Sequence, residues 1–153
     1  DLPTQRLQLL DDGRVLQQYA VSTSASGAGE RNGSGCTPRG RHRVRAMIGR
    51  GAPAGTVFVS RRPTGEICTP ELVQRYPHRD WILTRILWLC GLEPGRNRFG
   101  EVDTMRRYIY IHGTPDATPM GRPGSQGCIR MRNAELIELF DAVTPGIGVE
   151  IHA

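Results

Sequence analysis

The sequence predicts a mainly β protein, organised as a single domain over residues 1–153 with one or two helices packed on it. Three observations favour this class. The 19 glycines and 11 prolines recur along the whole chain and separate short segments. Many of those segments are rich in β-branched and aromatic residues, which is typical of strands. Only one segment, near the C-terminus, has the capping residue and apolar spacing of a secure helix.

The chain begins with a predicted β-hairpin. Leu7–Leu10 and Val15–Val21 flank Asp11-Asp12-Gly13, and an Asp-Gly pair supplies the positive φ that a tight hairpin turn needs. Residues 22–35 (STSASGAGERNGSG) are small and polar, so we expect a mobile loop that buries too little to order itself strongly. After a turn at Thr37-Pro38, the chain is predicted to continue as a strand.

Three more strands are predicted in the middle of the chain. Residues 55–60 form a short β-branched run. The apolar block Trp81–Leu92 fits a helix or a strand by periodicity alone, and its Ile, Thr and Trp content with the following GLEPG turn favours a buried strand. The segment RRYIYIHG, which begins at Arg106, is predicted as a strand ending on His112.

The helix is predicted to begin after Asn133, a favourable N-cap residue, and to end before Pro145. Glu135 lies in its first turn, where the helix dipole favours an anion. Leu136, Phe140 and Val143 share one face, which we expect to pack on the sheets. The final GVEIHA segment is predicted as a strand.

Composition excludes several classes of function. All 20 basic residues are arginine, so a Schiff-base lysine, a Ser–Lys dyad and a phosphate-binding loop lysine are excluded. The net charge is +5, yet the arginines are scattered apart from a cluster at Arg39–Arg45. With 6% aromatic residues and no recognisable module, nucleic acid is not the expected partner. A positive surface suits an anionic polymer or a carboxylate-bearing substrate better.

The chain has no apolar run long enough to cross a bilayer and no leader-like start, so any targeting segment was removed or never existed. The four cysteines, at positions 36, 68, 90 and 128, include no CxxC pair, and no metal site or cofactor is expected. If Cys128 is a working thiol, the other three allow either one disulfide or three buried free thiols.

The stretch Ile109–Met131 holds the candidate site. A cysteine acyltransferase or hydrolase needs a thiolate, a neutral imidazole, a group that orients the imidazole, and backbone N–H groups for the oxyanion. His112 ends a strand and Gly113 permits close approach of the backbone to a ligand. Gly127 permits a tight bend before Cys128. A small buried cysteine and a satisfied histidine are the alternative interpretation of the same residues.

The motifs IHGT and SQGCIRM, followed by the helix and the PGIGVEI strand, resemble the L,D-transpeptidase (YkuD-type) catalytic domain. The stretches LQLLDDGRVLQQYAVS, TPRGRHRV and ILWLCGLEPGRNRFGEVDTMRRYIYIHGT resemble further parts of that family. The resemblance covers nearly the whole chain. It implies a β-sandwich or barrel-like catalytic fold with one or two packed helices. Gln126 stands where many members carry a second histidine, so a proton-shuttling role at that position is not expected.

The resemblance implies roles for the catalytic residues. Cys128 would be the nucleophile, and His112 the base that later protonates the leaving D-alanine. The Gly113 carbonyl would orient the imidazole, and N–H groups around Gly127 and Cys128 would hold the oxyanion. If His112 is not the base, His42 and His78 are the other histidines to consider.

Four further residues are candidates for substrate contact. Arg130 matches the signature arginine, and either a structural ion pair or a substrate carboxylate would explain it. Ser125 either bonds within the turn or touches substrate, and Gln126 would position substrate. Tyr110 lies on the same side of the strand as His112 and either lines the pocket or packs in the core. Arg122 lies in the loop between His112 and Cys128 and is expected to be solvated.

The implied activity is peptidoglycan transpeptidation at the diaminopimelate–D-alanine bond of stem peptides. The acceptor is another diaminopimelate, a wall-anchored protein or a free D-amino acid, and water in its place would give an L,D-carboxypeptidase or wall-amide hydrolase. Carbapenems would acylate Cys128, and the compartment would be the periplasm or cell wall. A catalytically silent peptidoglycan-binding module is the alternative from a different class.

Overall fold

The computed structural model describes all residues 1–153 and confirms the mainly β class. Its elements, in chain order, are β1 (Arg6–Asp11), β2 (Arg14–Ala20), β3 (Gly40–Ile48), β4 (Thr56–Val59), β5 (Arg62–Ile67), α1 (Pro70–Arg75), β6 (Ile82–Gly91), the 3₁₀ helix η1 (Gly100–Val102), β7 (Tyr110–Gly113), β8 (Ile129–Met131), α2 (Asn133–Ala142) and β9 (Gly148–Ile151). Strands β1 and β2 form a separate hairpin, and the other seven strands form one sheet.

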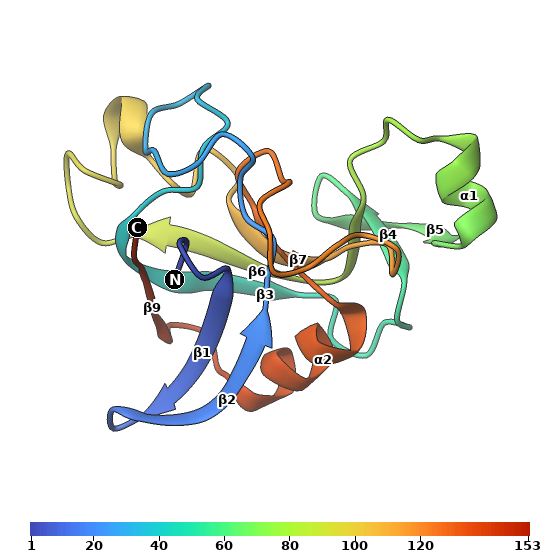
Figure 1. Cartoon of the computed structure of the whole chain (residues 1–153), viewed down its shortest axis with the longest axis horizontal. Helices are drawn as coiled ribbons and strands as arrows, with labels where there is room; N and C mark the ends of the chain where they lie inside the picture. Colours follow the sequence, from blue (N-terminus) through green and yellow to red (C-terminus); the bar gives the residue numbers. More distant parts are fainter.

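Strand β6 organises the seven-stranded sheet (Figure 1). It pairs antiparallel with β3, β4 and β7, and β9 continues the sheet beyond β3. The register of β6 shifts between Leu83 and Ile86, where Thr84 has a positive φ of 77°. Strands β7 and β8 form a parallel pair, which places the strand ending near His112 directly beside the strand that follows Cys128.

Helix α2 packs against β6 and β7 and covers the main core (Figure 1). Leu136, Leu139 and Phe140 are buried along its inner face, and burying each such side chain contributes roughly 1.5–3 kcal/mol. Val143, just past the helix, is also buried, so the predicted apolar face is confirmed.

The predicted N-terminal hairpin is confirmed. Asp12 and Gly13 both have positive φ, 49° and 78°, as a two-residue turn of this hand requires. The hairpin lies beside α2 in Figure 1, and the Tyr19 hydroxyl donates a hydrogen bond of 2.8 Å to Glu138 of that helix. Strands β3, β4, β6 and β9 also lie where the sequence predicts them. The strand predicted from Arg106 begins only at Tyr110, because residues 104–108 form a turn.

Two further local predictions are wrong. Asn133 is the first residue of α2, and Arg132 takes the N-cap position without a side-chain cap. The reason is tertiary, because the Asn133 amide is engaged by Thr84 of β6 and by Thr114, the residue after β7. The segment after β2 is not loose at its start, because Ser22, Thr23 and Ser24 are buried and form bridges to the Ser125 and Arg130 region.

The short strand β8 and the edge strand β5 are not apparent from the sequence pattern, since three residues carry no periodicity and β5 is largely exposed. The two termini lie near each other (Figure 1), and the Leu2 N–H donates to the His152 carbonyl at 2.8 Å. None of the helices has the length and apolar character required to span a bilayer.

Candidate active site

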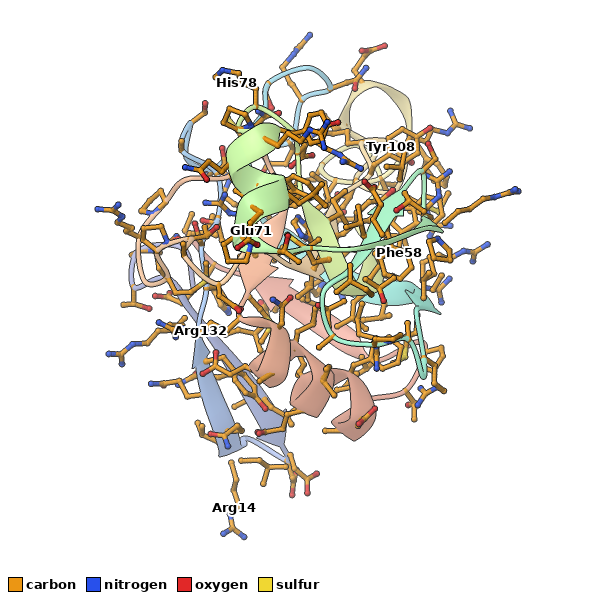
Figure 2. The ribbon with its side chains drawn as sticks, turned by 90° about the vertical axis from the view of Figure 1, so that its right-hand side faces the viewer. Arg14, Phe58, Glu71, His78, Tyr108 and Arg132 are labelled. Carbon is orange, nitrogen blue, oxygen red and sulfur yellow. The ribbon has the colours of Figure 1, made fainter.

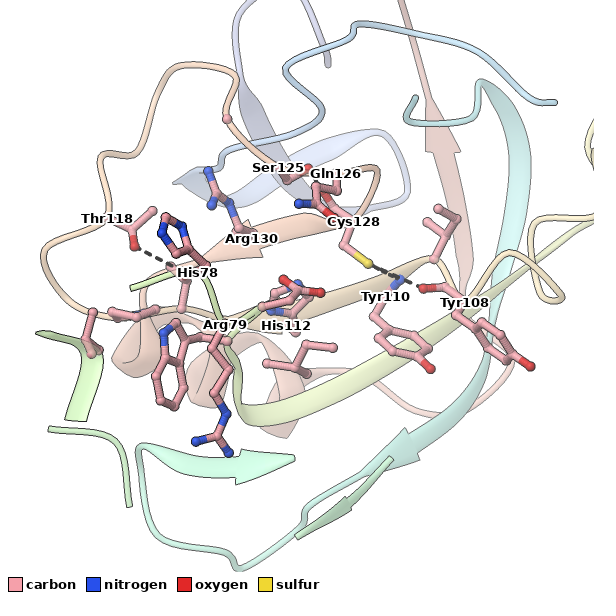
Figure 3. Close-up of a pocket in the computed structure, with 18 of the residues that line it drawn as sticks. His78, Arg79, Tyr108, Tyr110, His112, Thr118, Ser125, Gln126, Cys128 and Arg130 are labelled. Carbon is pink, nitrogen blue, oxygen red and sulfur yellow. Dashed lines mark hydrogen bonds between the residues drawn. The ribbon is translucent and has the colours of Figure 1, made fainter. Parts of the chain in front are cut away.

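A cleft of about 1050 Å³ opens above the paired strands β7 and β8 (Figure 3). Both His112 and Cys128 line it, together with Tyr110, Ser125, Gln126 and Arg130. The structure therefore brings all six of these predicted side chains to one cavity. The reason is the strand pairing, in which Ile111 lies opposite Ile129 and His112 opposite Arg130, so that Cys128 enters the cleft beside β7.

The imidazole of His112 is held in one orientation. Its Nδ1 lies 2.6 Å from the carbonyl oxygen of Gly113. A carbonyl oxygen only accepts hydrogen bonds, so Nδ1 carries the proton and Nε2 keeps its lone pair. Burial, at 2% exposure, lowers the pKa of His112 below its ordinary 6.5. The ring is therefore neutral near pH 7 and has the tautomer that a general base at Nε2 needs.

Gly113 is itself positioned by the bulge in β6. The hydroxyl of Thr84 donates to Asn133 Oδ1 at 2.5 Å, and Asn133 Nδ2 donates to the Thr114 carbonyl at 3.0 Å. A Cβ at Gly113 would clash with Asn133 Oδ1 and would lie 2.7 Å from the Leu83 carbonyl oxygen. Glycine is thus required at this point by space rather than by backbone angle.

The thiol of Cys128 is held by the backbone at the start of β7 and just before it. The Tyr110 N–H donates to Sγ at 3.3 Å, and Sγ donates to the Tyr108 carbonyl oxygen at 3.4 Å (Figure 3). Tyr108 has a positive φ of 56°, an uncommon conformation for an aromatic residue, and it presents that carbonyl to the sulfur. The thiol and the His112 ring make no direct hydrogen bond in this arrangement.

The protein packed around the sulfur raises the pKa of the Cys128 thiol to about 12 through desolvation, while the Tyr110 N–H opposes this shift. The resting pair is accordingly a neutral thiol and a neutral imidazole. Sγ must therefore give its proton to a base in the course of the reaction.

The turn before Cys128 is fixed by Ser125. Its hydroxyl donates to the Cys128 carbonyl oxygen at 2.6 Å and accepts from the Gly127 N–H at 3.2 Å. Gly127 has φ 130°, which L side chains rarely adopt, and the Thr37 hydroxyl donates to its carbonyl at 2.8 Å. The N–H groups of Gln126 and Cys128 donate no hydrogen bond within the chain. They are the backbone donors free to meet an oxyanion.

Arg130 has no carboxylate within ion-pair distance, so the structural ion pair considered above is not formed. One guanidinium nitrogen donates to the Ser22 hydroxyl at 2.7 Å, and its buried Nε has no partner. Desolvation lowers the pKa of Arg130 below its ordinary value, although a guanidinium stays protonated. A partly buried cation with an unused donor is suited to bind a carboxylate.

The remaining predicted residues differ in accessibility. Gln126 is exposed to the cleft, whereas the Tyr110 ring is buried against Trp88 and its hydroxyl accepts from Arg61 at 3.0 Å. Arg122 is exposed, as expected for a solvated residue. Of the other histidines considered, His78 lines the cleft.

His42 lies elsewhere, buried between the Gly40 carbonyl and the Thr104 hydroxyl. All four cysteines are free in the structure and partly exposed.

Among the cleft residues that sequence reasoning missed are Asp80, Trp81 and Arg107. Trp81 is buried, and its indole N–H has no hydrogen-bond partner. Asp80 is the one carboxylate lining the cleft, and beside the larger effect of burial its charge acts to raise the pKa of both His112 and Cys128. The sequence places Arg107 shortly before the strand that bears His112, which could have suggested a site residue. Whether its side chain faces the cleft depends on the fold.

Nearly the whole chain matches one known family. The family model described as "L,D-transpeptidase catalytic domain" (YkuD) matches residues 1–151. The chain belongs to the YkuD family. A comparison with curated proteins found no match.

Solved L,D-transpeptidases share the fold of this YkuD domain. The enzyme from Xylanimonas cellulosilytica is 20% identical with a TM-score of 0.55, and the alignment covers 99% of this chain and 57% of that one. L,D-transpeptidase 3 from Mycobacterium tuberculosis, solved with a faropenem-derived adduct, is 16% identical with a TM-score of 0.58 and coverage of 99% and 57%. The ertapenem-acylated catalytic domain from Enterococcus faecium is 16% identical with a TM-score of 0.53 and coverage of 99% and 92%.

The YkuD domain spans a little more than half the length of the first two of these chains and nearly all of the isolated catalytic domain. At these identities the likeness establishes the fold, and the family match assigns the chain to the L,D-transpeptidase catalytic domain family.

Proposed function

We propose that this YkuD domain, as one catalytic unit over residues 1–153, is a peptidoglycan L,D-transpeptidase that uses Cys128 as its nucleophile. The observation that carries the proposal is the joint presence in one cleft of the Cys128 thiol and a His112 ring whose Nδ1 is tied to the Gly113 carbonyl. That bond leaves Nε2 free to take a proton.

The first half-reaction follows from these contacts. A substrate carbonyl entering the cleft displaces the thiol from the Tyr108 carbonyl, and the Sγ proton passes to Nε2 of His112. Sγ attacks the amide carbon, and the free N–H groups of Gln126 and Cys128 receive the oxyanion. The protonated His112 then gives its proton to the leaving amine, which departs as D-alanine and leaves a thioester.

The second half-reaction regenerates the thiol. An acceptor amine attacks the thioester carbon, the C–S bond breaks as the C–N bond forms, and the proton released by the amine returns to Sγ through His112. Ping-pong kinetics are expected. Water in place of the amine would give a shortened stem peptide.

The charge of the cleft supports a stem-peptide donor. Arg130 offers an unused buried Nε–H and Trp81 an unused indole N–H, and buried donors without partners favour a ligand that supplies acceptors. The proposed substrate carries several carboxylates and amide carbonyls. Its site of action would be outside the cytoplasmic membrane, in the periplasm or cell wall, and a wall-anchored protein is one candidate acceptor.

Incubation with a purified disaccharide-tetrapeptide, followed by mass analysis of the products, tests the proposal. Free D-alanine and a condensed dimer are expected. Shortened monomer alone would contradict transfer and favour the hydrolase, and no product at all would favour a binding module.

Carbapenem exposure tests the nucleophile separately. The intact protein should gain the mass of one carbapenem, and Cys128→Ala should gain none. Cys90→Ala, which removes a thiol outside the cleft, is the matched control and should be acylated at the unaltered rate. Acylation of the Cys128→Ala protein would assign the reaction to another residue.

A further inference from the structure

A second hollow of about 650 Å³ adjoins the cleft at the turn that precedes Cys128. The two cavities share Arg107, Tyr108, Ser125 and Gln126 among their lining residues. A molecule in the second hollow would therefore approach the thioester past Gln126. Arg130, in contrast, lines the main cleft but not the second hollow.

The second hollow is cationic. Arg106 and Arg107 line it, and no aspartate or glutamate does. The main cleft also has arginines in its lining, but it includes a carboxylate as well, that of Asp80. The occupant that suits the second hollow is thus an anion, and a carboxylate is the anionic group that stem peptides and amino acids carry.

Arg107 is the residue best placed to bind such a group. Its half-buried guanidinium donates to three neutral oxygens, the Gly29 carbonyl at 3.2 Å, the Ser34 hydroxyl at 3.3 Å and the Cys36 carbonyl at 2.6 Å. No carboxylate lies within ion-pair distance. Desolvation lowers its pKa, so folding has already removed part of its hydration. The one carboxylate whose charge acts on it, that of Glu30, is already paired with Arg39.

We propose that Arg107 binds the carboxylate of the acceptor and so selects amines that carry a carboxylate over neutral amines. The inference rests on the proposed transpeptidase function. In the step concerned, the acceptor nitrogen attacks the thioester carbon, the C–S bond breaks, an amide C–N bond forms, and the amine proton passes through His112 to Sγ. Arg107 takes no part in these bond changes, and its role is to hold the acceptor in place.

The test compares two acceptors that differ in one group. With a disaccharide-tetrapeptide donor, D-methionine and D-methioninamide are varied separately, and kcat/KM for exchange into the stem peptide is measured by mass spectrometry. Arg107→Gln should lower the ratio of kcat/KM for the acid to that for the amide by about 10–100-fold, the range for loss of a charge-assisted hydrogen bond. The two amines differ in intrinsic reactivity, but this difference is the same for both proteins. It therefore cancels when the ratio of the variant is compared with that of the unaltered protein.

Arg14→Gln is the matched control, because Arg14 lies at the hairpin tip, at the opposite end of the molecule from Tyr108 and His78 (Figure 2). Its ratio should equal that of the unaltered protein. Arg107→Lys keeps the charge and should lower the ratio of kcat/KM for the acid to that for the amide several-fold. This variant is used for the test if Arg107→Gln does not fold.

An equal fall for both acceptors would overturn the inference and make Arg107 a clamp for residues 29–36. An unchanged ratio would overturn it as well. Release of D-alanine without exchange of either acceptor by the unaltered protein would instead refute the transpeptidase function itself, and the acceptor role with it.

Discussion

Replacing Gly113 with alanine should damage both the fold and the proposed base through one steric conflict. The new Cβ would lie 2.7 Å from the Leu83 carbonyl oxygen and would clash with Asn133 Oδ1. Ordinary contact begins near 3.4 Å, so β7 or β6 must move by about 0.7 Å to clear the Leu83 carbonyl, and the Asn133 side chain must also move and release Thr84.

The magnitude follows from these two costs. Overpacking costs about 1–3 kcal/mol, and loss of the Thr84–Asn133 hydrogen bond adds about 1 kcal/mol. The expected destabilisation of roughly 2–4 kcal/mol corresponds to a fall in Tm of roughly 5–15 °C for a chain of this length. Because the Gly113 carbonyl holds His112 Nδ1 at 2.6 Å, a shift of this size should also slow carbapenem acylation by about 100-fold.

Gly148→Ala is the matched control, since Gly148 also lies in a strand without a positive φ, and a Cβ added there would meet no atom within 4 Å. Urea unfolding measures stability, and the rate of mass gain with a carbapenem measures acylation. If Gly113→Ala unfolds at the same urea concentration as Gly148→Ala and is acylated at the unaltered rate, the steric argument is wrong.

Three further predictions concern titration and binding. Burial raises the pKa of the Cys128 thiol to about 12, so its alkylation by iodoacetamide should be slow at pH 7. The alkylation rate of Cys128 should rise about tenfold per pH unit through pH 10. A fast, pH-independent rate at neutral pH would contradict a neutral resting thiol. Burial lowers the pKa of both His42 and His112, so below pH 6.5 the unfolded chain binds protons that the folded chain excludes. The free energy of unfolding should therefore fall as the pH is lowered from 6.5 to about 5, by up to about 1.4 kcal/mol per pH unit for each histidine. Urea midpoints that do not change across this window would show that protonation of these rings does not destabilise the fold. Trp81→Phe removes an unpaired buried indole N–H, so it should raise KM for the tetrapeptide donor by about 5–10-fold with little change in stability. An unchanged KM would remove Trp81 from the binding site.

Local sequence signals predicted most of the strands. The Asp12-Gly13 turn fixes the hairpin because its backbone angles are nearly independent of the rest of the chain. The β-branched content of Trp81–Leu92 correctly favoured a strand, and the spacing of Leu136 and Phe140 correctly gave the buried face of α2. These features depend on neighbours in the sequence, so the sequence alone was sufficient for them.

The sequence also named the thiol and the imidazole as candidates, through the resemblance of the IHGT and SQGCIRM motifs to the L,D-transpeptidase family. Only the folded chain decided how they are held. The parallel pairing of β7 with the three-residue β8 places His112 beside Cys128, and the bulge at Thr84 directs Asn133 toward Gly113 instead of leaving it as a helix cap. The lack of an anion beside Arg107 and Arg130 is likewise a property of distant segments. Contacts between residues far apart in the chain leave no local pattern, and those contacts set the charge and shape of the cleft.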